Sequence, residues 1–379
     1  MRESPMHSLK IAIAGGSLGG LFAAVLLHAA GHEVTVFERS KHGLEGRGAG
    51  LVGQREIFAI LRAVGCEHVA RIGVVARERI FLDQGGRIVE RHETPQMQLS
   101  WDILFRSFRE RLPDRNYLQG RDAVSASENG GAAYLTFSDG ITVEADLVIG
   151  VDGVGSIVRK AVAGNDAAPV YAGYAAWRGL YPEVDLPNSA AETLREHFAF
   201  FNMHRSHILG YLVAGPDGSL EAGRRRYNWV WYRRLSDADG SLARELTDAS
   251  GHVHQYSLPA GAMPDAARDD LVRVAEETLP PQFAAAVSAE RSPFIQAIFD
   301  YAAPMMVTKR IALLGDAAFV VRPHTAMGVS KAAGDALALS NALAQADDLA
   351  TALAAYDATR RAVGNEITAY GRRLGASFV

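Results

Sequence analysis

The sequence predicts a mixed α/β fold in which the N- and C-terminal thirds form one domain and the middle third forms an inserted, β-rich domain. Three observations predict this fold. A short apolar run at residues 9–14 enters a glycine-rich turn, aromatic-rich strands alternate with polar loops over residues 170–298, and a second apolar run appears at residues 310–314. We therefore expect a first domain made of residues 1–169, with small β-hairpin insertions, and of residues 299–379, with C-terminal helices.

The composition is that of an ordinary globular protein without a strong net charge. With 379 residues, 48% of them hydrophobic, the chain is long enough for two or three domains and for a core that encloses a bulky ligand. The 39 Lys and Arg residues against 43 Asp and Glu residues predict no nucleic-acid and no membrane partner. Cys66 is the only cysteine, which excludes an intrachain disulfide and a zinc ribbon, so we expect no metal site and a reducing, cytoplasmic compartment.

The first domain is expected to begin with a βαβ unit. Leu9–Ala14 is an apolar run typical of a buried parallel strand. Leu18–Ala30 is rich in Leu and Ala and stops before Gly31, a residue that favours the left-handed conformation at the end of a helix. Val34–Glu38 then has the composition of the second strand.

Further along the chain, glycine turns indicate hairpins, and apolar patterns indicate the return to the first domain. The expected segments are hairpins at Arg79–Glu93 and Ala132–Ile149, strands at Tyr171–Tyr181 and Tyr227–Arg233, a buried strand at Arg310–Leu314, and helices at Gly328–Ala346 and Asp348–Leu374.

The turn after the first strand has the residue types of a pyrophosphate site. Gly15, Ser17 and Gly20 form a G-x-S-x-x-G pattern, which lets backbone N–H groups, that of Leu18 included, approach a pyrophosphate at a helix N-terminus. Glu38 ends the next strand, where a carboxylate accepts both ribose hydroxyls of an adenosine and repels a 2′-phosphate. A Rossmann-like domain that binds FAD or NAD is therefore predicted. The alternatives are a plain strand-to-helix turn and a solvated strand end.

Two other strand-and-turn segments contain acidic residues. Residues 146–159 read D-L-V-I-G-V-D-G-V-G-S-I-V-R, with Asp152 in the turn, and residues 310–318 read R-I-A-L-L-G-D-A-A, with Gly315 and Asp316. The first segment resembles the DG motif, and the second the GD motif, of the flavoprotein aromatic hydroxylases of the para-hydroxybenzoate hydroxylase type. The alternative is a pair of buried strands that each end in a Gly-Asp turn.

The resemblance covers essentially the whole chain and is greatest for the 2,6-dihydroxypyridine 3-monooxygenase branch, on the segments Arg47–Gly50, Asn228–Tyr232 and Arg322–His324. It implies an FAD-dependent monooxygenase that hydroxylates a small, electron-rich aromatic or heteroaromatic substrate of hydroxypyridine or phenol type. By the same resemblance, the reductant is expected to be NADH or NADPH, and O2 is expected to react through a flavin C4a-hydroperoxide. The residues implied to bind FAD, noncovalently, are Gly15, Ser17, Leu18, Gly20, Glu38, Arg39, Arg47, Gly48, Ala49, Asp152, Gly315, Asp316, Gly328 and Val329.

The loop before the penultimate helix is the predicted site of chemistry. A helix that begins near Gly328 would point backbone N–H groups at flavin N1 and the C2 carbonyl, which would stabilise negative charge on the reduced ring. By resemblance, Pro323 lies where the ring and the substrate meet. A base that deprotonates a substrate hydroxyl is most naturally a His or Tyr, and the candidates are His204, Tyr211 and His324.

Several alternatives stay open. Trp229 and Trp231 share one face of a strand, so they either wall the aromatic pocket or pack within the sheet. Another flavin oxidoreductase, a dehydrogenase or halogenase, would use the same scaffold, although the W-x-W segment here lacks the following I-P of a halogenase. A non-catalytic FAD-binding protein is the third alternative, and a homodimer is possible.

Overall fold

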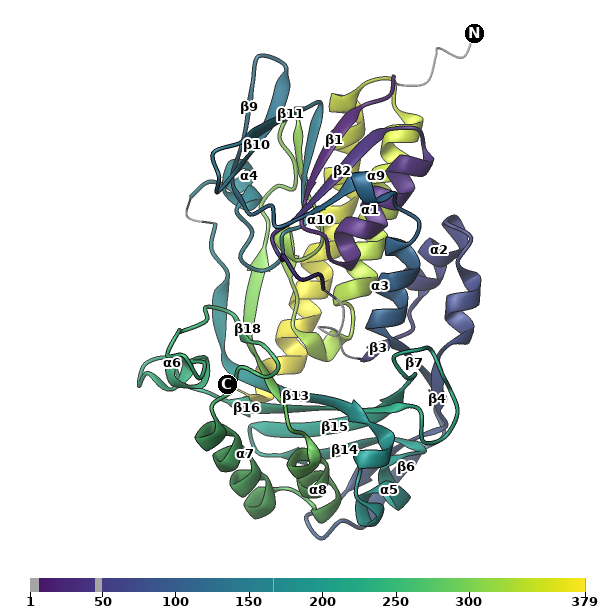
Figure 1. Ribbon diagram of the computed structural model, residues 1–379, viewed down its shortest axis with the longest axis vertical. Helices are drawn as coiled ribbons and strands as arrows, with labels where there is room; N and C mark the ends of the chain where they lie inside the picture. The colour runs from purple at the N-terminus through teal and green to yellow at the C-terminus, as the bar shows by residue number, and fades with distance from the viewer. Residues whose placement is uncertain (1–6, 45–49, 166, 379) are drawn as a thin grey trace.

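A five-stranded parallel sheet forms the centre of the first domain (Figure 1). The structure is a computed structural model, and it describes residues 7–44, 50–165 and 167–378. In sheet order the strands are β19 (Ile311–Leu313), β12 (Leu147–Gly150), β1 (Lys10–Ala14), β2 (Glu33–Glu38) and β8 (Tyr117–Gln119). Because β19 pairs in parallel with β12, the C-terminal third of the chain joins the N-terminal third in one sheet, as the sequence predicts.

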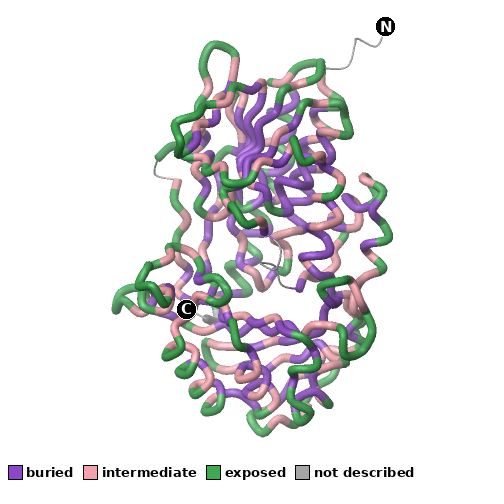
Figure 2. The backbone as a smooth tube through the Cα atoms, in the orientation of Figure 1, coloured by how far each residue is buried: buried purple, intermediate pink, exposed green. Residues whose placement is uncertain are grey.

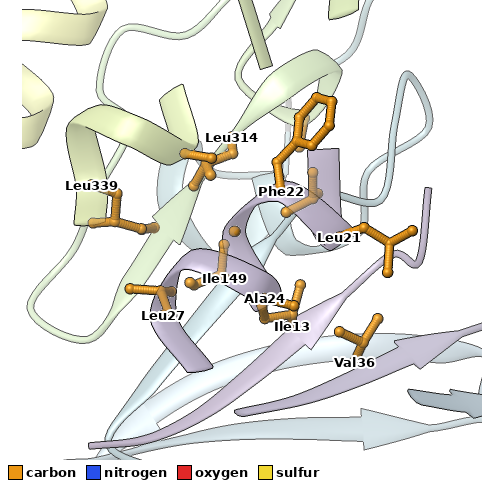
Figure 3. Packing of buried hydrophobic residues seen from close by; sticks show 14 of the residues in the cluster. Ile13, Leu21, Phe22, Ala24, Leu27, Val36, Ile149, Leu314 and Leu339 are labelled. Carbon is orange, nitrogen blue, oxygen red and sulfur yellow. The ribbon is translucent and has the colours of Figure 1, made fainter. Parts of the chain in front are cut away.

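Helix α1 (Leu18–Ala29) covers this sheet and is buried along most of its length. Its residues 18–27 are all buried, as expected of an apolar helix that is enclosed on several sides. Figure 3 shows Leu21 and Phe22 of this helix in one apolar cluster with Ile13 of β1. Gly31 adopts a φ of +92°, so the helix ends where the sequence predicts.

The middle of the chain forms a larger, mixed sheet. In sheet order its strands are β17 (Ser257–Leu258), β18 (Phe294–Ala302), β13 (Val170–Pro182), β16 (Arg226–Arg234), β15 (Ser206–Val213), β14 (His197–Met203), β5 (Glu78–Leu82) and β6 (Ile88–His92), and β20 (Phe319–Val320) pairs with β18. The hairpin β5–β6 thus extends the middle sheet through a parallel β5–β14 pair, although its sequence lies in the first third of the chain.

Three helices cover one face of this mixed sheet. They are α5 (Asn188–Leu194), α7 (Asp265–Thr278) and α8 (Pro281–Ala289), which lie beneath the sheet in Figure 1. Trp229 and Trp231 of β16 are buried in the core on that face. The structure therefore excludes Trp229 and Trp231 as walls of a pocket between the domains. Alternation along the strand places Asn228, Val230 and Tyr232 on the opposite face, which turns toward the first domain.

The C-terminal helices connect the two domains. α9 (Gly328–Gln345) packs on α1, and α10 (Leu349–Leu374) runs from the first domain down to β18 of the mixed sheet (Figure 1). A short 3-10 helix, Pro323–Thr325, precedes α9. Figure 2 shows buried residues concentrated in both sheets and in the helices between them. Among the helices in the described part of the chain, none is long and apolar enough to cross a bilayer.

The remaining elements flank these layers. They are helices α2 (Arg55–Ala63), α3 (Trp101–Arg109), α4 (Val158–Ala163) and α6 (Ser241–Glu245), one three-stranded sheet of β3 (Gly50–Val52), β7 (Gln96–Ser100) and β4 (Val74–Ala76), and another of β11 (Thr142–Ala145), β10 (Ala132–Phe137) and β9 (Ala123–Asn129).

Candidate functional site

The turn between β1 and α1 requires glycine at two of its positions. Gly15 has a φ of +108°, and a Cβ there would collide with the carbonyl group of Val151. A Cβ on Gly20 would collide with the carbonyl oxygen of Gly15, because α1 packs directly on the turn. Ser17 is the N-cap of α1, so the N–H groups of the first helical turn, beginning at Leu18, have no acceptor inside the helix. Free N–H groups at a helix N-terminus are the donors that bind a pyrophosphate.

Glu38 lies against this turn at the end of β2. It is buried, and its Oε2 accepts a hydrogen bond of 2.8 Å from the backbone N–H of Gly16. The hydroxyl of Tyr117 donates to the carbonyl oxygen of Gly16 at 2.9 Å, and Tyr117 also lines a pocket of about 630 Å³ together with His42 and Arg109. Glu38 and Tyr117 therefore contact the same glycine turn, and the pocket that Tyr117 lines has room for an adenosine.

Asp152 of the DG segment organises the start of α4. Its Oδ2 accepts hydrogen bonds from the backbone N–H groups of Ile157 (2.7 Å) and Val158 (3.2 Å), and its Oδ1 accepts one of 2.5 Å from the hydroxyl of Ser156. Burial raises the pKa of the Asp152 carboxyl, and these hydrogen bonds oppose that rise. Three donors of the chain itself thus engage this carboxylate.

Arg159 joins the DG segment to the GD segment. Its Nη2 donates to the carbonyl oxygen of Asp316 at 2.7 Å, and its Nε donates to that of Ala317 at 2.8 Å. The guanidinium also lies over the ring of Tyr301, 4.2 Å from its centroid. The two motifs, 157 residues apart in sequence, are therefore held in one rigid unit.

The GD segment presents a carboxylate that is oriented by a buried lysine. Gly315 has a φ of +58°, and its N–H donates to Asp335 at 2.9 Å. The Asp316 side chain is 48% exposed, and its Oδ1 accepts a hydrogen bond of 3.2 Å from Nζ of Lys331, whose own side chain is fully buried. Lys331 also donates to the carbonyl oxygen of Phe319. Lys331 thus positions both the Asp316 carboxylate and the backbone at Phe319.

The N-terminus of α9 leaves room for a ligand. A Cβ on Gly328 would meet no atom within 4 Å, so the protein's own packing does not require glycine there. The N–H groups of Gly328 and Val329, in the first turn of the helix, have no acceptor within it. The donors and acceptors described above suit FAD. The N–H groups at the start of α1 suit a pyrophosphate, and those at the start of α9 suit the flavin edge. The carboxylates of Glu38 and Asp316 suit hydroxyl groups.

A cluster of His and Tyr rings connects the mixed sheet to the loop before α9. His324 follows Pro323, and its Nε2 is 2.9 Å from the hydroxyl of Tyr174 on β13. Its ring centroid lies 4.2 Å from that of Tyr232 on β16 and 5.4 Å from that of His207 on β15. Burial lowers the pKa of His324 to about 3 and that of His207 to about 4, so both imidazoles are neutral near pH 7.

The structure separates the other two predicted base candidates from this cluster. His204 is exposed in the hairpin turn between β14 and β15, so it is corrected to a surface residue. Tyr211 is buried on β15, where its ring packs edge-on against Phe198 at 4.8 Å and lies next to Gly50. Arg39 is exposed just beyond Glu38.

Three predicted cofactor residues, Arg47, Gly48 and Ala49, lie outside the described residues. Sequence reasoning missed two residues of the site, His207 and Lys331. Alternation would have favoured His207 over His204, because His207 shares the parity of Tyr211 along its strand. Lys331 is the only lysine in the predicted helix 328–346, so the sequence alone could have singled it out as a candidate site residue.

Comparisons with known proteins agree with this geometry. A family profile described as "FAD binding domain-like" matches residues 171–300. The 2,6-dihydroxypyridine 3-monooxygenase of Paenarthrobacter nicotinovorans is 30% identical over 97% of this chain and 93% of its own length. The 6-hydroxynicotinate 3-monooxygenase of Pseudomonas fluorescens is 27% identical over 95% of this chain and 88% of its own.

Solved structures extend the likeness to three dimensions. The 2,6-dihydroxypyridine-3-hydroxylase of Arthrobacter nicotinovorans superposes with a TM-score of 0.91 and 28% identity, covering 99% of this chain and 93% of that one. The combined evidence of full-length similarity, the shared fold and the two acidic motifs shows that the chain belongs to the FAD-dependent aromatic monooxygenases, the class A flavoprotein hydroxylases.

Proposed function

We propose that this enzyme hydroxylates a single-ring hydroxypyridine or phenol, with NADH or NADPH as reductant and O2 as oxidant. The observation that carries the proposal is the juxtaposition of the α9 N-terminus with the cluster of His324, Tyr232, Tyr174 and His207. The α9 N-terminus can hold a flavin edge, and the cluster of four rings offers aromatic and imidazole surface to a small aromatic substrate.

The residues that would hold FAD follow from the donor sets described above. The turn of Gly15, Ser17, Leu18 and Gly20 would bind the pyrophosphate, and Glu38, with Arg39 beside it, would bind the adenosine ribose. Gly315 and Asp316 would bind the ribityl chain, and Gly328 and Val329 the flavin edge. Asp152 would support this site from the turn before α4, and Arg47 to Ala49 stay predicted contacts. FAD, when bound, supplies the redox centre that accepts hydride from NAD(P)H and activates O2.

The chain itself would orient the substrate. A neutral His324 can accept a hydrogen bond from a substrate hydroxyl, and the Tyr174 hydroxyl, at 2.9 Å from Nε2, fixes the orientation of that imidazole. His207 lies beside it and is also neutral, so neither imidazole carries a positive charge at the site near pH 7. Pro323 holds His324 at the start of the loop that leads to α9.

The test is to measure oxidation of NADH and of NADPH by the purified yellow protein with hydroxypyridines, hydroxynicotinates and hydroxybenzoates. We expect at least one of these aromatics to stimulate oxidation and to yield a hydroxylated product. Acid precipitation should release all of the flavin as FAD, because binding is noncovalent. Oxidation that no aromatic affects would overturn the proposal. The cytoplasmic location and a homodimer stay predictions.

A further inference from the structure

The start of α2 contacts both the loop before α9 and the first turn of α9. Gln54 immediately precedes α2, and its side-chain Nε2 donates a hydrogen bond of 3.0 Å to the carbonyl oxygen of Ala326. Two residues later, Oε2 of Glu56 accepts a hydrogen bond of 2.5 Å from the hydroxyl of Ser330. Because α2 also packs against α9, these two contacts belong to one interface between distant parts of the chain.

The contact of Gln54 is made to a residue whose backbone is strained. Ala326 has a φ of +54° and a ψ of +18°, which is the left-handed conformation that residues with a Cβ disfavour. The hydroxyl of Thr325 supports this turn, because it accepts a hydrogen bond of 3.1 Å from the N–H of Met327. Strain that neighbouring contacts maintain is typical of a functional loop, and this loop leads directly into α9.

The contact of Glu56 places a carboxylate beside the N-terminus of α9. Ser330 is the third residue of that helix and is buried, whereas Glu56 is half-buried. In the described part of the chain, no Lys, Arg or His side chain forms an ion pair with Glu56. The N-terminus of a helix carries a partial positive charge, and a carboxylate close to it offsets that charge. Glu56 therefore reduces the positive potential that α9 presents to a ligand.

The same helix end is the one proposed to hold the flavin edge. Gly328 and Val329, whose N–H groups have no acceptor within α9, immediately precede Ser330. A Cβ on Gly328 would meet no atom within 4 Å, so there is space for a ligand at this point. The N1 and C2 carbonyl edge of a flavin gains negative charge on reduction, and it is neutral when the flavin is oxidised. A nearby carboxylate therefore disfavours the reduced form and leaves the oxidised form almost unaffected.

We propose that the carboxylate of Glu56, acting beside Ser330 at the N-terminus of α9, lowers the reduction potential of bound FAD. This inference rests on the proposed function, because it requires the flavin edge to lie at that helix end. A lower potential makes reduced FAD a stronger electron donor to O2 and makes oxidised FAD a weaker acceptor of hydride from NAD(P)H. Glu56 tunes the cofactor through its charge, and Gln54 is a positioning residue that holds the loop at Ala326.

The test is the midpoint reduction potential of FAD in the purified holoenzyme, measured without an aromatic substrate by equilibration with a reference dye. Glu56→Gln removes the charge and keeps an acceptor oxygen for the Ser330 hydroxyl, so the potential should rise. We expect the affinity for reduced FAD to increase about tenfold relative to that for oxidised FAD, which corresponds to about 30 mV for a two-electron couple. The affinity for oxidised FAD should stay at about the parent value, because the oxidised ring is neutral.

Two matched controls separate the charge of Glu56 from its packing. Glu56→Asp retains the charge with a shorter side chain, so its potential should stay close to that of the parent. Glu67→Gln removes the same charge from an exposed position in the 3-10 helix after α2 and should leave the potential unchanged. The parent potential in Glu56→Gln, or an equal rise in Glu56→Gln and Glu56→Asp, would overturn the inference.

Turnover with the aromatic panel is measured separately, so that the two proposals can fail independently. A raised potential in Glu56→Gln, without a hydroxylated product from any aromatic, would support the role of Glu56 and contradict the proposed function. Hydroxylation by the parent, with the same potential in Glu56→Gln as in the parent, would support the proposed function and contradict the role of Glu56.

Discussion

Nη2 of Arg159 donates a hydrogen bond of 2.7 Å to the backbone carbonyl oxygen of Asp316. This contact joins the two acidic motifs through main chain, and it leaves the Asp316 carboxylate free to face outward beside Lys331. Arg159 is itself buried, so its charge is balanced by carbonyl dipoles and by the ring of Tyr301. The position of the GD segment therefore depends on a residue of the DG segment.

Replacing Arg159 with methionine is expected to weaken FAD binding and to destabilise the fold. Two carbonyl oxygens, those of Asp316 and Ala317, would lose their buried donor, at a cost of about 1–3 kcal/mol for each group left unsatisfied. Thermal unfolding with and without added FAD measures both effects. Lys160→Met, at the exposed neighbouring position, is the matched control and should behave as the parent. Equal stability of the two variants would show that the Arg159 contacts contribute nothing.

Asp316→Ala is expected to lower FAD affinity about tenfold to hundredfold, because a ribityl hydroxyl would lose a charged acceptor that contributes about 1.5–3 kcal/mol. The carboxylate is half-exposed, but its loss also removes the acidic partner of buried Lys331, so thermal unfolding of the apoprotein is needed to separate an effect on the fold from one on FAD affinity. Titration of the apoprotein with FAD gives the dissociation constant, and Asp347→Ala on the surface is the control. A folded Asp316→Ala variant with the parent's FAD affinity would exclude this residue from the site.

Gly328→Val is expected to disturb the ligand and to leave the protein's own packing intact. A Cβ at this position meets no protein atom within 4 Å, so the apoprotein should unfold at about the parent temperature. The added side chain would instead occupy the space before the α9 N-terminus and displace the flavin edge from the backbone N–H groups. The measurements are FAD affinity and peroxide released per NAD(P)H oxidised. If the FAD affinity and the peroxide yield both equal the parent values, Gly328 is only the first residue of α9 and does not contact the flavin.

Because His324 and His207 are neutral in the folded protein, we expect acid to weaken the contact between the mixed sheet and the loop before α9. Their pKa values, about 3 for His324 and about 4 for His207, lie below the ordinary 6.5. Below about pH 6.5 the unfolded chain binds more protons than the folded one, so their contribution is fully present above that pH and is lost as the pH falls toward 4. Urea midpoints at about pH 7.5 and about pH 5 should therefore differ less in His324→Gln than in the parent. His204→Gln, at the exposed turn, should retain the parent's difference.

Local periodicity was enough to predict the strands and the helix of the first βαβ unit, whereas the two acidic motifs were identified by their resemblance to the family. The run Leu9–Ala14, the helix that ends before Gly31 and the strand that ends at Glu38 all form as the sequence indicates, because each is specified by its own apolar pattern. These elements also determine where backbone donors and carboxylates for a dinucleotide gather.

The residues of the proposed substrate site depend on contacts that no local pattern specifies. Alternation showed that Trp229 and Trp231 share a face, but only the helices α7 and α8, packed from later in the chain, decide which face is covered. His204 and His207 lie three residues apart, and the hairpin turn between β14 and β15 determines that only His207 points toward His324.

The most direct test of the central claim is to supply the holoenzyme with NADH or NADPH, an aromatic substrate that stimulates its oxidation, and isotopically labelled O2. Mass spectrometry of the product then shows the origin of the added oxygen. The account predicts a hydroxylated ring that contains one labelled oxygen atom for each substrate converted. NAD(P)H oxidation that yields only labelled peroxide or water with every aromatic, or a product whose new oxygen is unlabelled, would contradict it.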